Sequence, residues 1–248
     1  MGRKLEICCT SFESARNADQ SGADRIELCD NIFEGGTTPS LGLIKKVKKQ
    51  LKIKLYVLIR PRGGDFCYSA DEFEIIKYDI DSCRQEGVDG IVSGVLNIDG
   101  TIDVVRTKEL VIRSQDMDFT FHRAFDLVKD YRKGLEDVIA TGASRILTSG
   151  LKENVVDGAA TLKDLQKRSN GRIKIMAGGG LNSKNIQKII DETGCNEFHT
   201  TAKKWINSSS QVKPNINLNA SKDIPETMKM VASTDEIDKL KIFINANQ

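Results

Sequence analysis

The sequence predicts an α/β protein, a single closed (β/α)8 barrel of the TIM type with parallel strands. Three observations predict it. Eight short apolar runs alternate with longer amphipathic stretches, a glycine-containing motif recurs before every second run, and 248 residues match the size of one such barrel, about 250 residues. An open doubly wound sheet is the alternative, but it predicts no fourfold repeat, and no Gly-x-Gly-x-x-Gly follows the first run.

The apolar runs have the length of strands and extend from about residue 5 to residue 202. They lie at residues 5–9, 25–29, 55–60, 90–96, 119–123, 145–149, 173–178 and 197–201. Helix start signals lie between them: Ser69-Ala70-Asp71-Glu72 fits a capping box, and Thr38-Pro39 offers an N-cap followed by proline. Because parallel strands need crossover connections, this alternation predicts a parallel sheet covered by helices.

The repeated motif sets the register of the strands. In each copy a glycine ends a helix, a turn follows, and the chain enters a strand; the glycines are Gly22, Gly87, Gly142 and Gly194. Strand side chains alternate between the two faces of a sheet. The apolar column four residues after each glycine should therefore pack outward against the helices, and it consists of Ile26, Ile91, Ile146 and Phe198. The next column, which includes Glu27 and His199, then faces the barrel interior.

The same alternation gathers polar side chains at the carboxyl ends of the strands. The predicted mouth holds Glu6, Cys8, Glu27, Cys29, Arg60, His122 and His199, with Asp126 in the loop just beyond. Barrel enzymes keep their chemistry at this end. The candidate catalytic residues are Glu27, Arg60, His122, Asp126 and His199. The alternative is a self-neutralising ion cluster, but both histidines of the chain fall here, which favours a functional site.

Cys8 and Cys29 form a candidate metal site. Both are predicted to face inward at similar height on neighbouring strands, and two thiolates are soft donors that suit Cu(I). Free cysteine also serves as a small buried hydrophobe, so packing is the alternative role. A further alternative is a hard divalent ion on Glu6, Glu27 and His199, from three neighbouring strands.

Glycine-rich segments near the mouth suggest an anion site. Gly178, Gly179 and Gly180 end the seventh predicted strand and Thr201 ends the eighth, where barrel enzymes frequently hold phosphate. Arg62 adds a second cation beside Arg60. The candidate ligand is therefore a small anionic molecule, a class that includes phosphorylated ones; the alternative is that these glycines only permit tight turns.

Composition sets the expected surroundings of the protein. Lys and Arg number 37 against 35 Asp and Glu, so nucleic acid is not an expected partner. The longest apolar run, residues 55–59, is far shorter than the roughly 20 residues that span a bilayer, so no membrane segment is expected. Six cysteines and no apolar export segment lead us to expect free thiols in the cytoplasm.

Several segments together resemble the CutC copper homeostasis protein family, from residue 5 to about residue 202. They include Leu5-Glu6-Ile7-Cys8, Gly22-Ala23-Asp24-Arg25-Ile26-Glu27-Leu28-Cys29, Ile59-Arg60-Pro61-Arg62-Gly63-Gly64-Asp65-Phe66, Thr120-Phe121-His122-Arg123-Ala124-Phe125-Asp126 and Glu197-Phe198-His199. The resemblance implies a (β/α)8 barrel, a cytoplasmic copper-handling role, self-association as a dimer or tetramer, and Cu(I) on Cys8 and Cys29. A copper carrier needs only thiolates, however, so the remaining mouth residues keep open an enzyme of unassigned reaction.

The tail completes a single domain spanning residues 1–248. Residues 203–248 are expected to form a loop and a final helix, with the Ser- and Asn-rich stretch 207–222 as the loop and residues 234–244 as the helix. Apolar positions at Ile237, Leu240 and Ile244 should pack that helix on the barrel.

Overall fold

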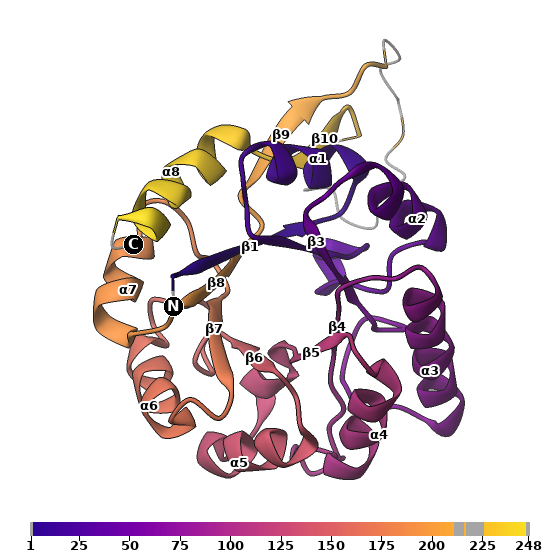
Figure 1. Ribbon diagram of the computed structural model, residues 1–248, viewed down its shortest axis with the longest axis vertical. Helices are drawn as coiled ribbons and strands as arrows, with labels where there is room; N and C mark the ends of the chain where they lie inside the picture. Colours follow the sequence, from indigo (N-terminus) through magenta and orange to yellow (C-terminus); the bar gives the residue numbers. More distant parts are fainter. Residues whose placement is uncertain (1, 211–215, 217–225, 247–248) are drawn as a thin grey trace.

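A computed structural model, which describes residues 2–210, 216 and 226–246, confirms the predicted barrel. The eight strands close in sequence order, and every neighbouring pair, including the first with the last, is parallel. Figure 1 looks down the barrel and shows the helices as an outer ring around the strands. Because all eight strands run in the same direction, their carboxyl ends lie together at one mouth.

The strands lie close to their predicted positions. They are β1 (Lys4–Cys9), β2 (Arg25–Leu28), β3 (Lys54–Leu58), β4 (Gly90–Ser93), β5 (Asp118–Phe121), β6 (Arg145–Thr148), β7 (Lys174–Gly178) and β8 (Glu197–Thr200). Arg60 and His122 follow strands β3 and β5 rather than belonging to them. The structure ends most strands earlier than predicted because the pairing stops where the loops of the mouth begin.

Helices cover the outer face of the sheet. They are α1 (Phe12–Gln20), α2 (Leu41–Gln50), α3 (Ala70–Gln85), α4 (Val104–Ser114), α5 (Tyr131–Thr141), α6 (Ala159–Ser169), α7 (Ile186–Thr193) and α8 (Thr234–Asn245), with 3-10 turns η1 (Ile32–Glu34) and η2 (Arg123–Leu127). The predicted capping box is present, with Ser69 and Glu72 in reciprocal hydrogen bonds. The predicted cap at Thr38 is wrong: Ser40 caps α2, while Thr38 Oγ1 accepts from the main-chain N–H of Arg60 at 3.0 Å.

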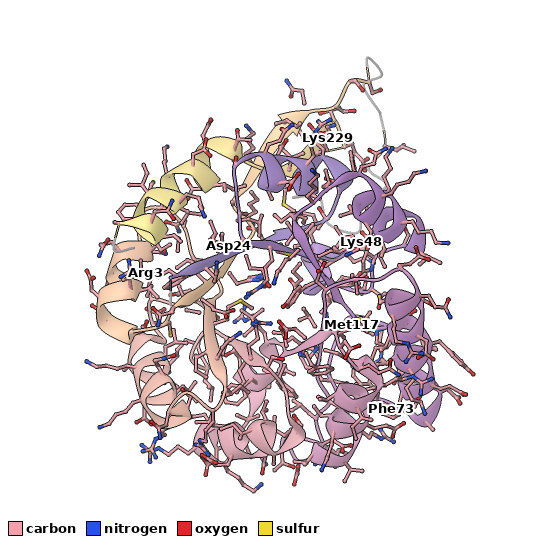
Figure 2. All side chains as sticks on the ribbon, in the orientation of Figure 1. Arg3, Asp24, Lys48, Phe73, Met117 and Lys229 are labelled. Atoms are coloured by element: carbon pink, nitrogen blue, oxygen red, sulfur yellow. The ribbon has the colours of Figure 1, made fainter. Side chains whose placement is uncertain are left out.

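The predicted register holds across the barrel wall. The outward column of Ile26, Ile91, Ile146 and Phe198 is fully buried in the apolar layer between sheet and helices. Cys9 lies in that layer too, whereas Cys8 and Cys29 belong to a separate inner cluster with Tyr56, Leu58 and Val92. Nitrogen, oxygen and sulfur atoms gather at the centre of the barrel in Figure 2, so the interior is polar as well as apolar.

The tail contains an element that the sequence analysis missed. After β8 the chain forms an antiparallel hairpin of β9 (Lys203–Asn207) and β10 (Met228–Ala232), which joins the barrel wall to α8. Helix α8 confirms the predicted final helix, and Ile237, Leu240 and Ile244 are buried. The predicted loop at 207–222 lies mostly outside the described residues. In the described part of the chain, no helix is long and apolar enough to cross a membrane.

Candidate metal and ligand site at the barrel mouth

The mouth of the barrel holds a cavity of about 340 Å³. Most of the predicted site residues line it: Cys8, Glu27, Cys29, Arg60, His122, Gly179, Gly180, His199 and Thr201. Phe66, Arg123 and Lys203 also line it, from the loops after β3 and β5 and from the start of β9. The cavity therefore brings together the cysteines, the histidines and two of the predicted anion-binding glycines.

Cys8 and Cys29 face each other at the base of this cavity. Their sulfur atoms lie 3.2 Å apart, within thiol hydrogen-bonding distance, and both side chains are buried. The hydrogen bond between Cys8 and Cys29, together with burial, raises the pKa of the Cys8 thiol well above its ordinary value, and the nearby Glu27 carboxylate adds to the rise. Without a cation the Cys8 thiol is therefore held in the protonated form.

His199 connects the cavity with the layer below it. Its Nδ1 lies 2.7 Å from Glu6 Oε1, and its Nε2 lies 3.7 Å from Glu27 Oε2. Burial alone would lower the pKa of His199, but the Glu27 and Glu6 carboxylates outweigh burial and raise it. Burial also raises the pKa of Glu27. The imidazole thus shares its environment with two buried carboxyl groups, one on each side.

Glu6 does not line the mouth, in contrast to the prediction. It is fully buried one layer deeper, where Arg25 Nε donates to it at 2.5 Å. Although burial opposes ionisation, Arg25 and His199 hold the pKa of Glu6 at about 2. Glu6 is therefore an ionised partner that orients His199, and it is already engaged by two side chains.

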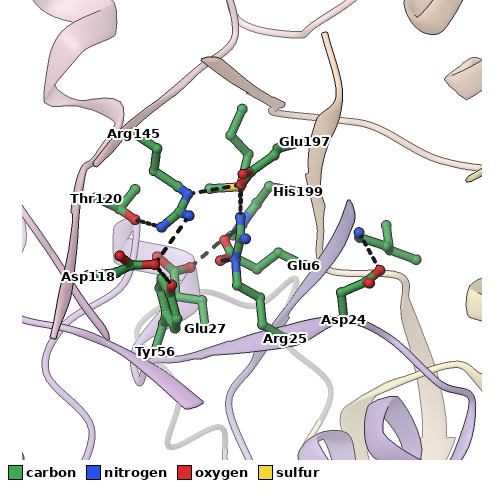
Figure 3. Close-up of polar contacts among 12 residues, drawn as sticks. Glu6, Asp24, Arg25, Glu27, Tyr56, Asp118, Thr120, Arg145, Glu197 and His199 are labelled. Atoms are coloured by element: carbon green, nitrogen blue, oxygen red, sulfur yellow. Dashed lines mark hydrogen bonds and ion pairs between the residues drawn. The ribbon is translucent and has the colours of Figure 1, made fainter. Parts of the chain in front are cut away.

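A second ion network continues below Glu6 toward the amino ends of the strands (Figure 3). Arg25 also bonds Glu197, which accepts from Arg145 Nε at 2.9 Å. Arg145 reaches Thr120 Oγ1 at 3.2 Å, and Tyr56 bonds Asp118 beside it. Tyr56 fits because Gly90 has no side chain: a Cβ there would lie 2.6 Å from the tyrosine ring. These residues form an internal ion cluster. For Glu6, which bonds Arg25, this is the alternative role that the sequence left open.

The group best placed to hold a metal ion differs from the predicted hard-ion set. Ligand atoms of Cys8, Glu27 and His199 lie within 4.8 Å of one another, so Cys8 takes the place predicted for Glu6. Cys29 lies beside Cys8. The donor set therefore offers two sulfurs, an imidazole nitrogen and a carboxylate oxygen, and the sulfurs favour a soft or borderline ion.

Arg60 and His122 line the same cavity as the thiols. Both are buried, and Arg60 is held by main-chain carbonyl oxygens of Glu34, Gly36 and Gly64. His122 Nδ1 accepts from the main-chain N–H of Ala124 at 3.3 Å, as the N-cap of η2. Arg60 and His122 thus offer the cavity hydrogen-bond donors and, from Arg60, a positive charge.

Asp126 does not line the cavity. Its carboxylate accepts from the main-chain N–H groups of Ser149 and Leu151, at 3.0 and 3.1 Å, and from the hydroxyl of Thr148. Arg123 donates to it at 2.7 Å. With its oxygens engaged this way, Asp126 acts as a structural residue that fixes the turn after β6, where Leu151 adopts a φ of 62°.

Two of the predicted anion-binding residues, Arg62 and Gly178, do not line the cavity. Arg62 Nε bonds Glu72 at 2.5 Å, and its remaining donors hold Asp65 and nearby carbonyls. Gly178 packs beneath the cavity, where a Cβ would lie 2.6 Å from Leu147 and 3.1 Å from the Cβ of His199. Because Gly178 has no side chain, it leaves room for His199. This packing accounts for a glycine at the position without any role in anion binding.

The sequence analysis missed Arg25, Arg145 and Glu197. Each lies two residues before a position predicted to face inward, so the same alternation extended toward the strand starts would have found them. Phe66 was quoted only as part of a loop, yet its ring contacts both Arg60 and His122.

Comparisons with known proteins identify the family of the chain. The model of the CutC family matches residues 3–204, which is most of the chain. The chain belongs to the CutC family. A CutC family protein of Chromobacterium violaceum is 45% identical over 213 residues, 86% of this chain and 86% of the relative. A human protein named copper homeostasis protein cutC homolog is 43% identical over 212 residues, 86% of this chain and 78% of the relative.

A solved structure supports the same assignment. The crystal structure of a CutC protein from Streptococcus agalactiae superposes with a TM-score of 0.76 at 35% sequence identity, covering 80% of this chain and 98% of the other. The CutC match ends at residue 204, just after β8, so the barrel carries the family resemblance.

Proposed function

We propose that this CutC family member acts in copper homeostasis by binding Cu(I) between Cys8 and Cys29. The observation that carries the proposal is the 3.2 Å contact between the two sulfurs at the base of an accessible cavity. Thiolates are the protein ligands that select Cu(I). The human and mouse relatives bear the name copper homeostasis protein, which supports the same role.

The surroundings of the pair suit a cation that replaces protons. Cys8 has a raised thiol pKa and Glu27 lies nearby, so an unmetallated thiolate pair would place like charges together. A bound Cu(I) offsets one of the two negative charges that the thiols acquire. His199, whose pKa is raised by the Glu27 and Glu6 carboxylates, lies beside Glu27.

The proposal includes a cytoplasmic location and assembly as a homodimer or homotetramer. Six cysteines without a disulfide fit a reducing compartment. Val105 and Ile112 on α4 are exposed, as is Ile98 just before that helix, and such apolar side chains support a contact between copies. Light scattering after size-exclusion chromatography tests the assembly: a monomer at all protein concentrations would contradict it.

Anaerobic titration of the reduced protein with Cu(I) against a competing chelator tests the copper site. The expected result is tight binding of one equivalent, lost when Cys8→Ser and Cys29→Ser are combined. Cys67→Ser is the matched control, because Cys67 is a thiol outside the cavity. Weak binding, or equal binding in all three proteins, would remove the copper proposal.

The same cavity favours a second candidate function, an enzyme of the barrel class acting on a small anionic substrate. The specific observation is that Glu27, a carboxyl with a raised pKa, shares the cavity with His199, Arg60 and His122. A carboxyl that keeps its proton at higher pH is suited to general acid catalysis. Here Glu27→Gln should abolish turnover, once a substrate is found by screening.

A further inference from the structure

Arg60 is a buried cation without a carboxylate partner. Only 3% of the residue is exposed, and three of its N–H groups donate to main-chain oxygens at 2.6 to 2.9 Å. Among the described residues, no Asp or Glu oxygen lies within ion-pair distance of its guanidinium. Buried charges in proteins are normally paired with an opposite charge, so Arg60 carries a positive charge that the fold leaves uncompensated.

His122 offers an unused donor beside this cation. Because Nδ1 accepts from Ala124, the neutral ring carries its proton on Nε2. Neither His122 Nε2 nor Arg60 Nε has a hydrogen-bond partner in the part of the chain that the structure describes. Burial, together with the charge of Arg60, lowers the pKa of His122 to about 3, so the ring stays neutral at physiological pH.

The ring of Phe66 contacts both Arg60 and His122. Its ring centroid lies 4.7 Å from that of His122 and 4.8 Å from the guanidinium carbon of Arg60. All three residues line the mouth cavity, and the two unpartnered nitrogens are covered from solvent. A buried polar atom without a partner destabilises the fold, so such atoms beside a ligand-sized cavity call for a partner from outside the chain.

We infer that Arg60 and His122 form a subsite for the carboxylate group of a small organic molecule, which enters as the Phe66 ring turns aside. A carboxylate presents two oxygens to two donors, and its single negative charge matches the single charge of Arg60. A phosphate group carries about −1.5 to −2 at pH 7. It would leave excess negative charge in a cavity that also contains Glu27. The inference concerns donors other than the thiols and does not depend on copper.

Acetate, lactate and inorganic phosphate are suitable probes, because the chain has only two histidines and their imidazole nitrogens are readily distinguished by NMR. Acetate and lactate should shift the His122 Nε2 signal saturably, and phosphate should bind more weakly than either. Calorimetry then compares variants. His122→Asn keeps an acceptor for Ala124 but loses the donor at Nε2, whereas His122→Gln retains a donor near that position.

His122→Asn and Arg60→Met should each weaken carboxylate binding at least tenfold, and His122→Gln should weaken it less. Arg172→Met is the control, because Arg172 pairs with Glu136 and does not line the cavity. Circular dichroism checks folding; if Arg60→Met fails to fold, the two His122 variants carry the test. No saturable shift, unchanged binding in His122→Asn, or preference for phosphate would each overturn the inference. Failure here is separable from failure of the copper site, because the Cys8 and Cys29 double variant should bind the probes normally.

Discussion

Cys8 Sγ and Cys29 Sγ lie 3.2 Å apart although the two residues are 21 positions apart in the chain. The contact exists because β1 and β2 are parallel neighbours, with Cys8 opposite Glu27 and Cys29 two residues beyond. Residues on one face of a strand recur every second position, so both sulfurs point into the barrel. The barrel register, rather than a local sequence motif, creates the thiol pair.

The register predicts that Cys8 and Cys9 respond differently to the same substitution. Cys8→Ala should lower Cu(I) affinity by more than about 100-fold, because removing even a residue that only orients a metal ligand costs about 10–100-fold. Cys9→Ala should leave the affinity unchanged, since Cys9 packs in the outer apolar layer. Competition titrations of the two variants check this, and equal losses would show that the register is not what selects the ligand.

Copper binding should become stronger as pH rises. The pKa of Cys8 is well above its ordinary value of 9.0, so its thiol is protonated at neutral pH and must lose that proton when Cu(I) binds. The affinity should therefore rise about tenfold per pH unit for each thiol proton released. Titrations over about two pH units around neutrality, corrected for protonation of the chelator, measure this slope. An affinity independent of pH would argue against thiol ligands.

The pKa values of the two histidines should lie on opposite sides of the ordinary value of 6.5. His122, with a pKa of about 3, stabilises the fold above pH 6.5, and this contribution is lost as pH falls from 6.5 toward 3. His199 has a raised pKa, so its contribution is fully present below 6.5 and is lost as pH rises through the folded-state pKa. NMR titration of the imidazole signals separates them; two ordinary curves near 6.5 would contradict the burial and charge arguments.

The ion network below the site should matter for stability. Arg25→Met leaves Glu6 and Glu197 buried without their shared cation, and breaking a buried pair in this way costs about 3–5 kcal/mol. Lys4→Met is the control: it removes an exposed ion pair with Asp24, worth about 0–1 kcal/mol. Urea unfolding of both variants gives the comparison. Similar free energies of unfolding would show that the network contributes no more than a surface pair.

Strand alternation and the glycine repeat were sufficient to predict the barrel, the thiol pair and most of the mouth, because a two-residue period fixes which side chains share a face. They could not place Glu6 relative to the cavity, since side-chain height depends on how strands are staggered. The roles of Asp126 and Arg62 were also beyond reach, because loop conformation decides that Asp126 binds the turn at Ser149 and that Arg62 binds Glu72. The β9–β10 pair lacked a signal because both strands are short, β9 is largely exposed, and β10 is buried only at its last two residues.

X-ray absorption at the copper edge, on the protein loaded anaerobically with one equivalent of Cu(I), tests the central claim most directly. The account predicts a copper atom bound by two sulfurs, and the loss of both from the spectrum of the Cys8→Ser and Cys29→Ser double variant. A ligand shell of nitrogen and oxygen alone in the unmodified protein would contradict it, and would assign the mouth cavity to a function that does not use the thiol pair.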